Sequence, residues 1–118
     1  MSRIESKLAE LGLTLPSPPP PGGNYLPFRI EGKTLYLPAG DRTRLALGDL
    51  DRVDHVISVS GYVNCVAGFP DSPKVINGAS DLLVALLGDD GRHVRAAVGV
   101  AGLPANSATE VQMIVALK

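Results

Sequence analysis

The segment 74–87 carries apolar residues at helical spacing and lies between two segments with the composition of β-strands. Its apolar residues are Val75, Ala79, Leu82, Leu83, Leu86 and Leu87. Residues three, four and seven positions apart share one face of a helix, and Gly88 favours the left-handed conformation that ends one. The flanking segments 53–63 and 94–101 are rich in valine, which favours strands. Because a helix with one apolar stripe buries it against another layer, the pattern predicts a helix lying on a sheet.

A second, shorter helix is predicted at the N-terminus. Ser2 followed three residues later by Glu5 has the pattern of a capping box, in which each residue satisfies a backbone N–H of the other. Apolar residues at helical spacing follow at Ile4, Leu8 and Leu11. Gly12 offers a left-handed stop, so the helix is short and amphipathic.

The next segment, 15–23, consists mostly of proline and ends in two glycines. It can form neither a helix nor a strand ladder and should run as extended polyproline II. We therefore expect residues 1–23 to be a helix with a tether, and residues 24–118 to be one domain.

Within that domain, segments 25–30 and 34–37 predict a hairpin, because Gly32 suits the tight reversal between them. Pro27 lacks a backbone N–H and restricts the first strand to an edge or a bulge. Two further elements are expected: the last turn of a helix at 45–47, and a strand at 108–117. Strands interleaved with two helical segments indicate an α+β domain whose helices cover one face of the sheet.

The charge and composition of the chain exclude several classes of binding partner. Eleven basic and twelve acidic residues nearly cancel, so no broad positive field exists to bind nucleic acid. The single cysteine, Cys65, excludes an intrachain disulfide, and residues 1–5 lack the apolar run of a signal peptide, which favours a cytoplasmic location. The longest apolar run, 82–87, is far shorter than the roughly 20 residues of a membrane span. We expect no nucleic-acid or membrane partner.

The segment after Gly91 suggests an anion site. A strand from Val94 places Arg95 on one face together with Ala97, Gly99 and Ala101, because side chains alternate between the two faces. Small neighbours would leave room around the guanidinium for a small anion in two-pronged contact. A solvated surface arginine on an amphipathic strand is the alternative interpretation.

The same segment resembles a known family. It reads Arg-x-Ala-Val-Gly-Val-Ala-x-Leu-Pro over 95–104 and is followed by a strand that carries Glu110. This pattern is similar to the C-terminal signature of the RidA/YjgF family, also known as endoribonuclease L-PSP. Most of the remaining chain also resembles, in the same order, a subgroup of this family with an extra N-terminal helix. The matching segments are 4–15, the Tyr25 strand, 35–40, 48–53, 61–64 and 73–83.

The resemblance implies a fold and an activity. The fold is the YjgF/chorismate-mutase-like one, with helices on one face of a mixed β-sheet, usually assembled as a homotrimer with clefts between subunits. The activity is hydrolysis of small 2-imino or enamine acids to 2-keto acids and ammonia without a cofactor. A non-catalytic module that binds small carboxylates, or a regulatory partner of another enzyme, remains the alternative for the same fold.

The resemblance also assigns site residues. Arg95 matches the arginine that holds the substrate carboxylate, and Glu110 matches an acidic residue that could orient the hydrolytic water or carry a proton. Tyr25 aligns with a pocket tyrosine of the family, although an aromatic side chain that packs on a hairpin explains it equally well. Asn77 aligns with an asparagine of the family's helix, although a polar residue at the start of a helix explains it equally well. His93 and His55 have no ligand partners at metal-site spacing, so no metal is expected.

The sequence departs from the family after Gly40. Relatives have a Gln where Asp41 stands, and then a few dozen residues with a strand and most of a long helix. The chain is therefore either a true deletion variant or one from which a segment has dropped, and a true deletion should expose apolar surface unless an oligomer covers it. Ala97 stands where relatives often carry Cys or Ser, so no nucleophile is expected there.

Overall fold

The computed structural model describes residues 2–17, 20, 23–38, 43 and 46–118. The elements are α1 (Arg3–Glu10), β1 (Arg29–Glu31), β2 (Thr34–Pro38), β3 (Val53–Asn64), α3 (Ser72–Leu87), β4 (Val94–Val100) and β5 (Thr109–Leu117), with 3-10 turns η1 (Leu50–Arg52), η2 (Gly88–Gly91) and η3 (Pro104–Asn106). The strands form a five-stranded sheet in the order β1-β2-β5-β3-β4. β3 and β4 are parallel and the other pairs antiparallel, so the sheet is mixed.

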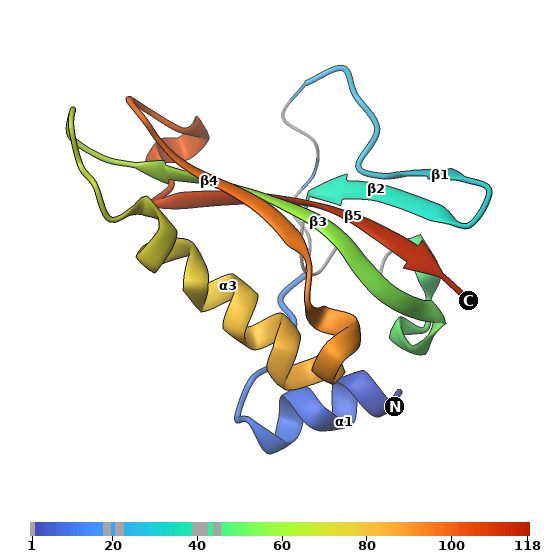
Figure 1. Cartoon of the computed structure of the whole chain (residues 1–118). Helices are drawn as coiled ribbons and strands as arrows, with labels where there is room; N and C mark the ends of the chain where they lie inside the picture. Colours follow the sequence, from blue (N-terminus) through green and yellow to red (C-terminus); the bar gives the residue numbers. More distant parts are fainter. Residues whose placement is uncertain (1, 18–19, 21–22, 39–42, 44–45) are drawn as a thin grey trace.

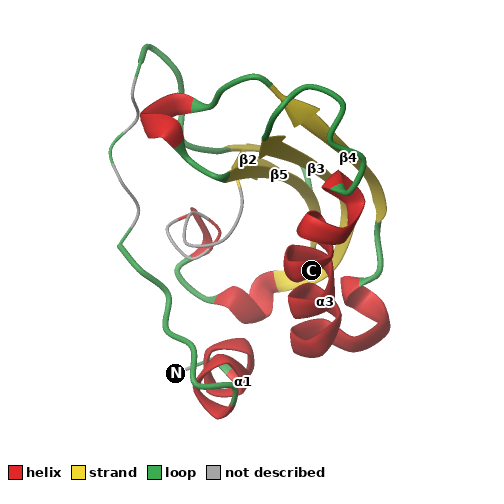
Figure 2. Cartoon of the chain, turned by 90° about the vertical axis from the view of Figure 1, so that its left-hand side faces the viewer, coloured by secondary structure: helices red, strands yellow, loops and turns green. Residues whose placement is uncertain are grey.

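The helices α1 and α3 lie on the same side of the sheet, which confirms the predicted α+β arrangement (Figure 1, Figure 2). α3 packs on β3 and β4, and it lies close to β3 at Gly61, where an added Cβ would lie 2.6 Å from the Ile76 side chain. The apolar core continues on the same side of β2, β3 and β5. No helix in the described part of the chain is long and apolar enough to cross a membrane.

The local sequence signals predicted most elements well. The capping box of α1 is present, with the Glu5 amide donating to Ser2 Oγ at 3.1 Å and the Ser2 amide to Glu5 Oε2 at 3.2 Å. α3 ends at Gly88, whose φ is +63°. The predicted hairpin exists, but its first strand begins only at Arg29, after Pro27, because a residue without an N–H cannot donate to the ladder.

The apolar stripe of α3 is only partly covered by the described residues. Beside it lies a cavity of about 210 Å³ between α3, α1 and the sheet. Its walls include Leu82, Leu83, Leu86 and Leu87 of α3 and Ile4 and Leu8 of α1. The expected gap after Gly40 falls at residues 39–42 and 44–45, and the predicted helical turn begins at Leu45; these residues lie outside the described ones, although Ala46 and Leu47 are helical.

β4 and β5 follow one another in the chain but are not neighbours in the sheet. A hairpin around Pro104 would pair β4 directly with β5 and bring Arg95 next to Ile114. Instead β3 lies between the two strands: Val59 is the partner of both Arg95 and Met113. The connection after β4 therefore crosses the end of β3, an arrangement that short-range sequence signals do not encode.

Asp51 holds α1 against the domain. Its Oδ2 accepts the Arg3 amide at 2.8 Å and its Oδ1 the Ile4 amide at 3.2 Å. Those amides belong to the first turn of α1, and the N–H groups of a first turn have no acceptors within their own helix. The Arg3 amide hydrogen bond holds the pKa of Asp51 below its usual value.

We expect Asp51→Ala to loosen α1 without unfolding the sheet. Amides of α1 should exchange with solvent about fivefold faster or more, because two cap bonds are lost. Since the pKa is lowered in the folded state, the carboxylate stabilises docking at pH values above the ordinary pKa of Asp. That contribution is lost as the pH falls through the lowered pKa, so wild-type α1 should loosen only in acid.

Hydrogen exchange by mass spectrometry measures this, and Asp54→Ala, which removes an exposed carboxylate on β3, is the matched control. Equal exchange of α1 in both variants at neutral pH would contradict the docking role of Asp51.

Candidate functional site

Arg95 lies on β4, at the edge of the sheet, and its side chain faces α3. The register pairs Arg95 with Val59 and Ala97 with Gly61, and Gly61 contacts Ile76 of α3. The guanidinium is held by the helix. Its Nη1 donates to Asn77 Oδ1 at 2.8 Å and to Ser80 Oγ at 3.1 Å, and its Nη2 donates to the Pro73 carbonyl at 3.3 Å.

These contacts leave part of the guanidinium unused. An arginine carries five N–H groups, and the helix engages three of them. Among the described residues, the N–H of Nε and one N–H of Nη2 have no acceptor. Nε and Nη2 are neighbouring donors along one edge of the group and match the two oxygens of a carboxylate.

Asn77 and Arg95 were both predicted as binding residues, and the structure brings them together. Ser80 and the Pro73 carbonyl were missed. They could have been found, because residues 73, 77 and 80 have the i, i+4, i+7 spacing of a single helix face.

The room that the sequence predicted beside the Arg95 guanidinium is occupied by α3. Ala97 and Gly99 share its face, but α3 lies over them, and a Cβ added at Gly99 would come within 2.7 Å of Cys65 Sγ and 3.4 Å of Ser72 Oγ. The small side chains therefore let the start of α3 approach the sheet.

Glu110 does not join Arg95 within one chain. It is the partner of Tyr62 on β3, whereas Arg95 is the partner of Val59. Positions 59 and 62 differ by an odd number, so their side chains leave opposite faces of the strand. Glu110 lies exposed on the face away from the helices, and its carboxylate makes no hydrogen bond or ion pair with another described residue.

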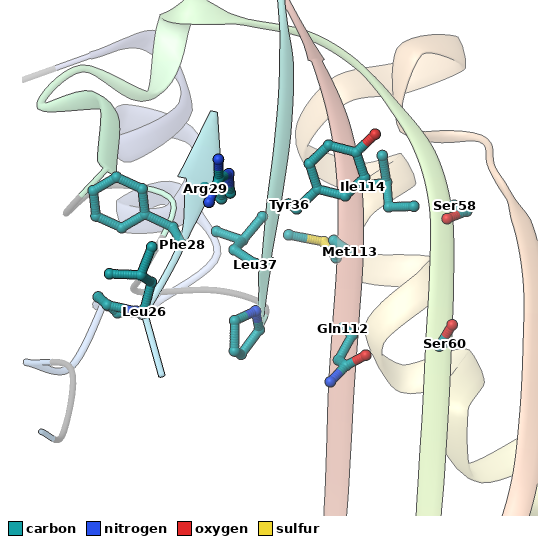
Figure 3. A pocket seen from close by; sticks show the side chains of 12 residues that line it. Leu26, Phe28, Arg29, Tyr36, Leu37, Ser58, Ser60, Gln112, Met113 and Ile114 are labelled. Carbon is teal, nitrogen blue, oxygen red and sulfur yellow. The ribbon is translucent and has the colours of Figure 1, made fainter. Parts of the chain in front are cut away.

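The same open face carries a hollow of about 440 Å³ near the β1 edge of the sheet (Figure 3). Its lining residues are Leu26, Pro27, Phe28, Arg29, Tyr36, Leu37, Pro38, Ser58, Ser60, Gln112, Met113 and Ile114. Tyr25, predicted as a pocket residue, is 54% exposed and does not line the hollow, although it directly precedes the wall formed by residues 26–29. Arg29 is paired with Glu31 at 2.9 Å.

Other reactive groups are scattered. Cys65 is a free, partly buried thiol, and His55 contacts Asp54 at 2.7 Å on the far end of β3. In residues 2–17, 20, 23–38, 43 and 46–118, no three His, Cys, Asp or Glu side chains gather as a metal-binding group would require.

Sequence comparison finds one curated relative and no family profile. No protein-family profile matches the chain. Protein TCP17 of Trypanosoma cruzi is 49% identical over 73 residues, which are 61% of this chain and 46% of that protein. The chain thus matches about half the length of this relative.

Comparison of structures is more extensive. Protein Atu1372 of Agrobacterium tumefaciens, whose function is unknown, is 35% identical with a TM-score of 0.86, covering 98% of this chain and 94% of that chain. A proposed endoribonuclease from Shewanella oneidensis is 26% identical with a TM-score of 0.89, covering 97% and 99%. RidA from Psychrobacter, at 20% identity, TM-score 0.59 and coverage of 84% and 93%, shares the fold. These matches show that the chain has the fold of the RidA/YjgF family, the family that the Arg95 signature resembles.

Proposed function

We propose that the protein binds small 2-imino acids through Arg95 and hydrolyses them to 2-keto acids and ammonia. The observation that carries the proposal is which N–H groups of the Arg95 guanidinium are engaged by the protein and which are not. α3 engages three of its N–H groups and leaves Nε and one Nη2 hydrogen, a pair that fits one carboxylate. An arginine already fixed by the protein loses little conformational entropy when the ligand binds.

The chemistry needs only water and a proton carrier. Water adds to C2 of the imine, and the tetrahedral carbinolamine then loses the nitrogen as ammonia while C2 becomes a ketone. Both protons of the water end on the nitrogen: one is transferred as the carbinolamine forms and the other as ammonia departs. Glu110, an exposed carboxylate with no described partner, would accept the first proton and return it. No cofactor is needed for this hydrolysis.

The complete site would be shared between copies of the chain. Arg95 belongs to the β4 edge and faces α3, whereas Glu110 and the 440 Å³ hollow belong to the opposite face. One copy therefore supplies the anchor and another the carboxylate and the hollow. The open face also exposes Val94 by 71%, Val98 by 48% and Tyr36 by 45%, and association would cover these side chains. We propose a homotrimer in the cytoplasm.

Ammonia release decides between hydrolysis and binding. 2-Aminoacrylate generated enzymatically in the presence of the protein should yield ammonia faster than in its absence. Calorimetric titration with 2-ketobutyrate should show binding at one site per chain. Binding without faster ammonia release would favour the non-catalytic module, and the absence of both would refute the proposed function.

Glu110→Gln is expected to retain 2-ketobutyrate binding but to lower kcat by about 100-fold or more, because it keeps the shape and loses the proton acceptor. Mixing it with Arg95→Ala tests the shared site. If the two residues act across an interface, mixed oligomers recover activity, because some interfaces then contain both wild-type residues. Asp54→Asn, which removes an exposed carboxylate outside the hollow, is the control for loss of a negative charge. Full activity of Glu110→Gln would assign Glu110 a structural role.

A further inference from the structure

Beyond the anchor itself, Ser80 and His93 form a chain of hydrogen bonds that ends on Arg95. His93 Nδ1 lies 2.6 Å from the Gly91 carbonyl, and His93 Nε2 lies 2.9 Å from Ser80 Oγ. Ser80 Oγ in turn lies 3.1 Å from Arg95 Nη1. Both His93 and Ser80 are partly buried.

The direction of these bonds follows from their chemistry. A carbonyl oxygen only accepts, so the proton of a neutral His93 ring is on Nδ1 and its Nε2 is an acceptor. The Ser80 hydroxyl must then donate to Nε2. Its lone pairs remain to accept the Arg95 Nη1–H, so the donation runs from Arg95 through Ser80 to His93.

Without His93, the Ser80 hydroxyl has another choice. A serine inside a helix can donate to the backbone carbonyl four residues earlier, which would turn its lone pairs away from the strand. His93 prevents this rotation because it supplies an acceptor on the β4 side. Asn77 holds the other Nη1 hydrogen at 2.8 Å, so the plane of the guanidinium is fixed from two sides.

We propose that Ser80 and His93 are positioning residues that keep the Nε and Nη2 edge of Arg95 directed to the ligand. The role of this edge rests on the proposed function. The orientation of the guanidinium does not, since it depends only on the hydrogen bonds within the chain.

The first test is therefore independent of any ligand. Nitrogen NMR of the labelled full chain should give separate, slowly exchanging Nη1 and Nη2 signals for Arg95, because three contacts hinder rotation. Ser80→Ala and His93→Phe should merge these signals, while Ser80→Thr, which keeps the hydroxyl, should not. Unchanged Arg95 signals in both Ser80→Ala and His93→Phe would overturn the positioning role.

The second test uses 2-ketobutyrate. Ser80→Ala and His93→Phe should each weaken binding about tenfold, in line with loss of one hydrogen bond to a charged group. The double variant should be no weaker than Ser80→Ala alone, because His93 acts through Ser80. Ser80→Thr should bind within about threefold of wild type. Losses that simply add in the double variant would overturn the relay.

The two tests separate the failures. If wild type does not bind 2-ketobutyrate but the NMR signals respond as expected, the proposed function is wrong and the positioning stands. If wild type binds but Ser80→Ala and His93→Phe bind equally well with unchanged melting temperatures, the positioning is wrong and the anchor stands.

Discussion

Replacing Arg95 by alanine is expected to lower the affinity for 2-ketobutyrate by about 100-fold or more. The substitution removes the two N–H groups available to a carboxylate, and each hydrogen bond to a charged group contributes about 1.5–3 kcal/mol. Arg95→Lys should bind almost as poorly, because an ammonium cannot present two parallel donors. Calorimetry measures both affinities.

Arg95→Ala also removes three contacts with α3, so its melting temperature should fall modestly while the sheet stays folded. Arg92→Ala is the matched control, since Arg92 is exposed and paired only with Asp89, at 3.3 Å, among the described residues. It should bind like wild type. Wild-type affinity in a folded Arg95→Ala variant would remove Arg95 from the site.

Gly91→Ala is expected to be the most destabilising single methyl addition in the described part of the chain. A Cβ at Gly91 would lie 2.2 Å from the Leu83 carbonyl oxygen and 2.9 Å from the Val84 nitrogen. Both atoms belong to the backbone of α3, so neither can move aside as a side chain would. The free energy of unfolding, measured with urea, should fall by about 1–3 kcal/mol or more.

Gly78→Ala is its control on α3. An added Cβ there meets nothing within 4 Å, and alanine in a helix is favoured over glycine, so the free energy of unfolding should rise by about 0.5–1 kcal/mol. Gly91→Ala should also weaken ligand binding, because the Gly91 carbonyl fixes the His93 ring. Equal free energies of unfolding for the two variants would contradict this prediction, because the backbone around residue 91 would then accommodate the methyl group without loss of stability.

The sequence by itself determined the local elements. The capping box of Ser2, the apolar stripe of α3 and its stop at Gly88 all depend on residues a few positions apart, and each was predicted close to its observed bounds. The family signature around Arg95 indicated the fold class, which the structure confirms. Arg95 and Asn77 were also predicted from the sequence as binding residues, and Arg95 Nη1 donates to Asn77 Oδ1 at 2.8 Å; their role in binding stays a prediction.

The tertiary structure alone decided which face and which neighbour each site residue has. β3 enters between β4 and β5, so Arg95 and Glu110 leave opposite faces of the sheet, although only fifteen positions separate them. α3 covers the small residues that a strand pattern left open beside Arg95, and it brings Ser80 to the guanidinium. Strand order and helix docking arise from contacts between distant segments, and alternation along one strand carries no information about them.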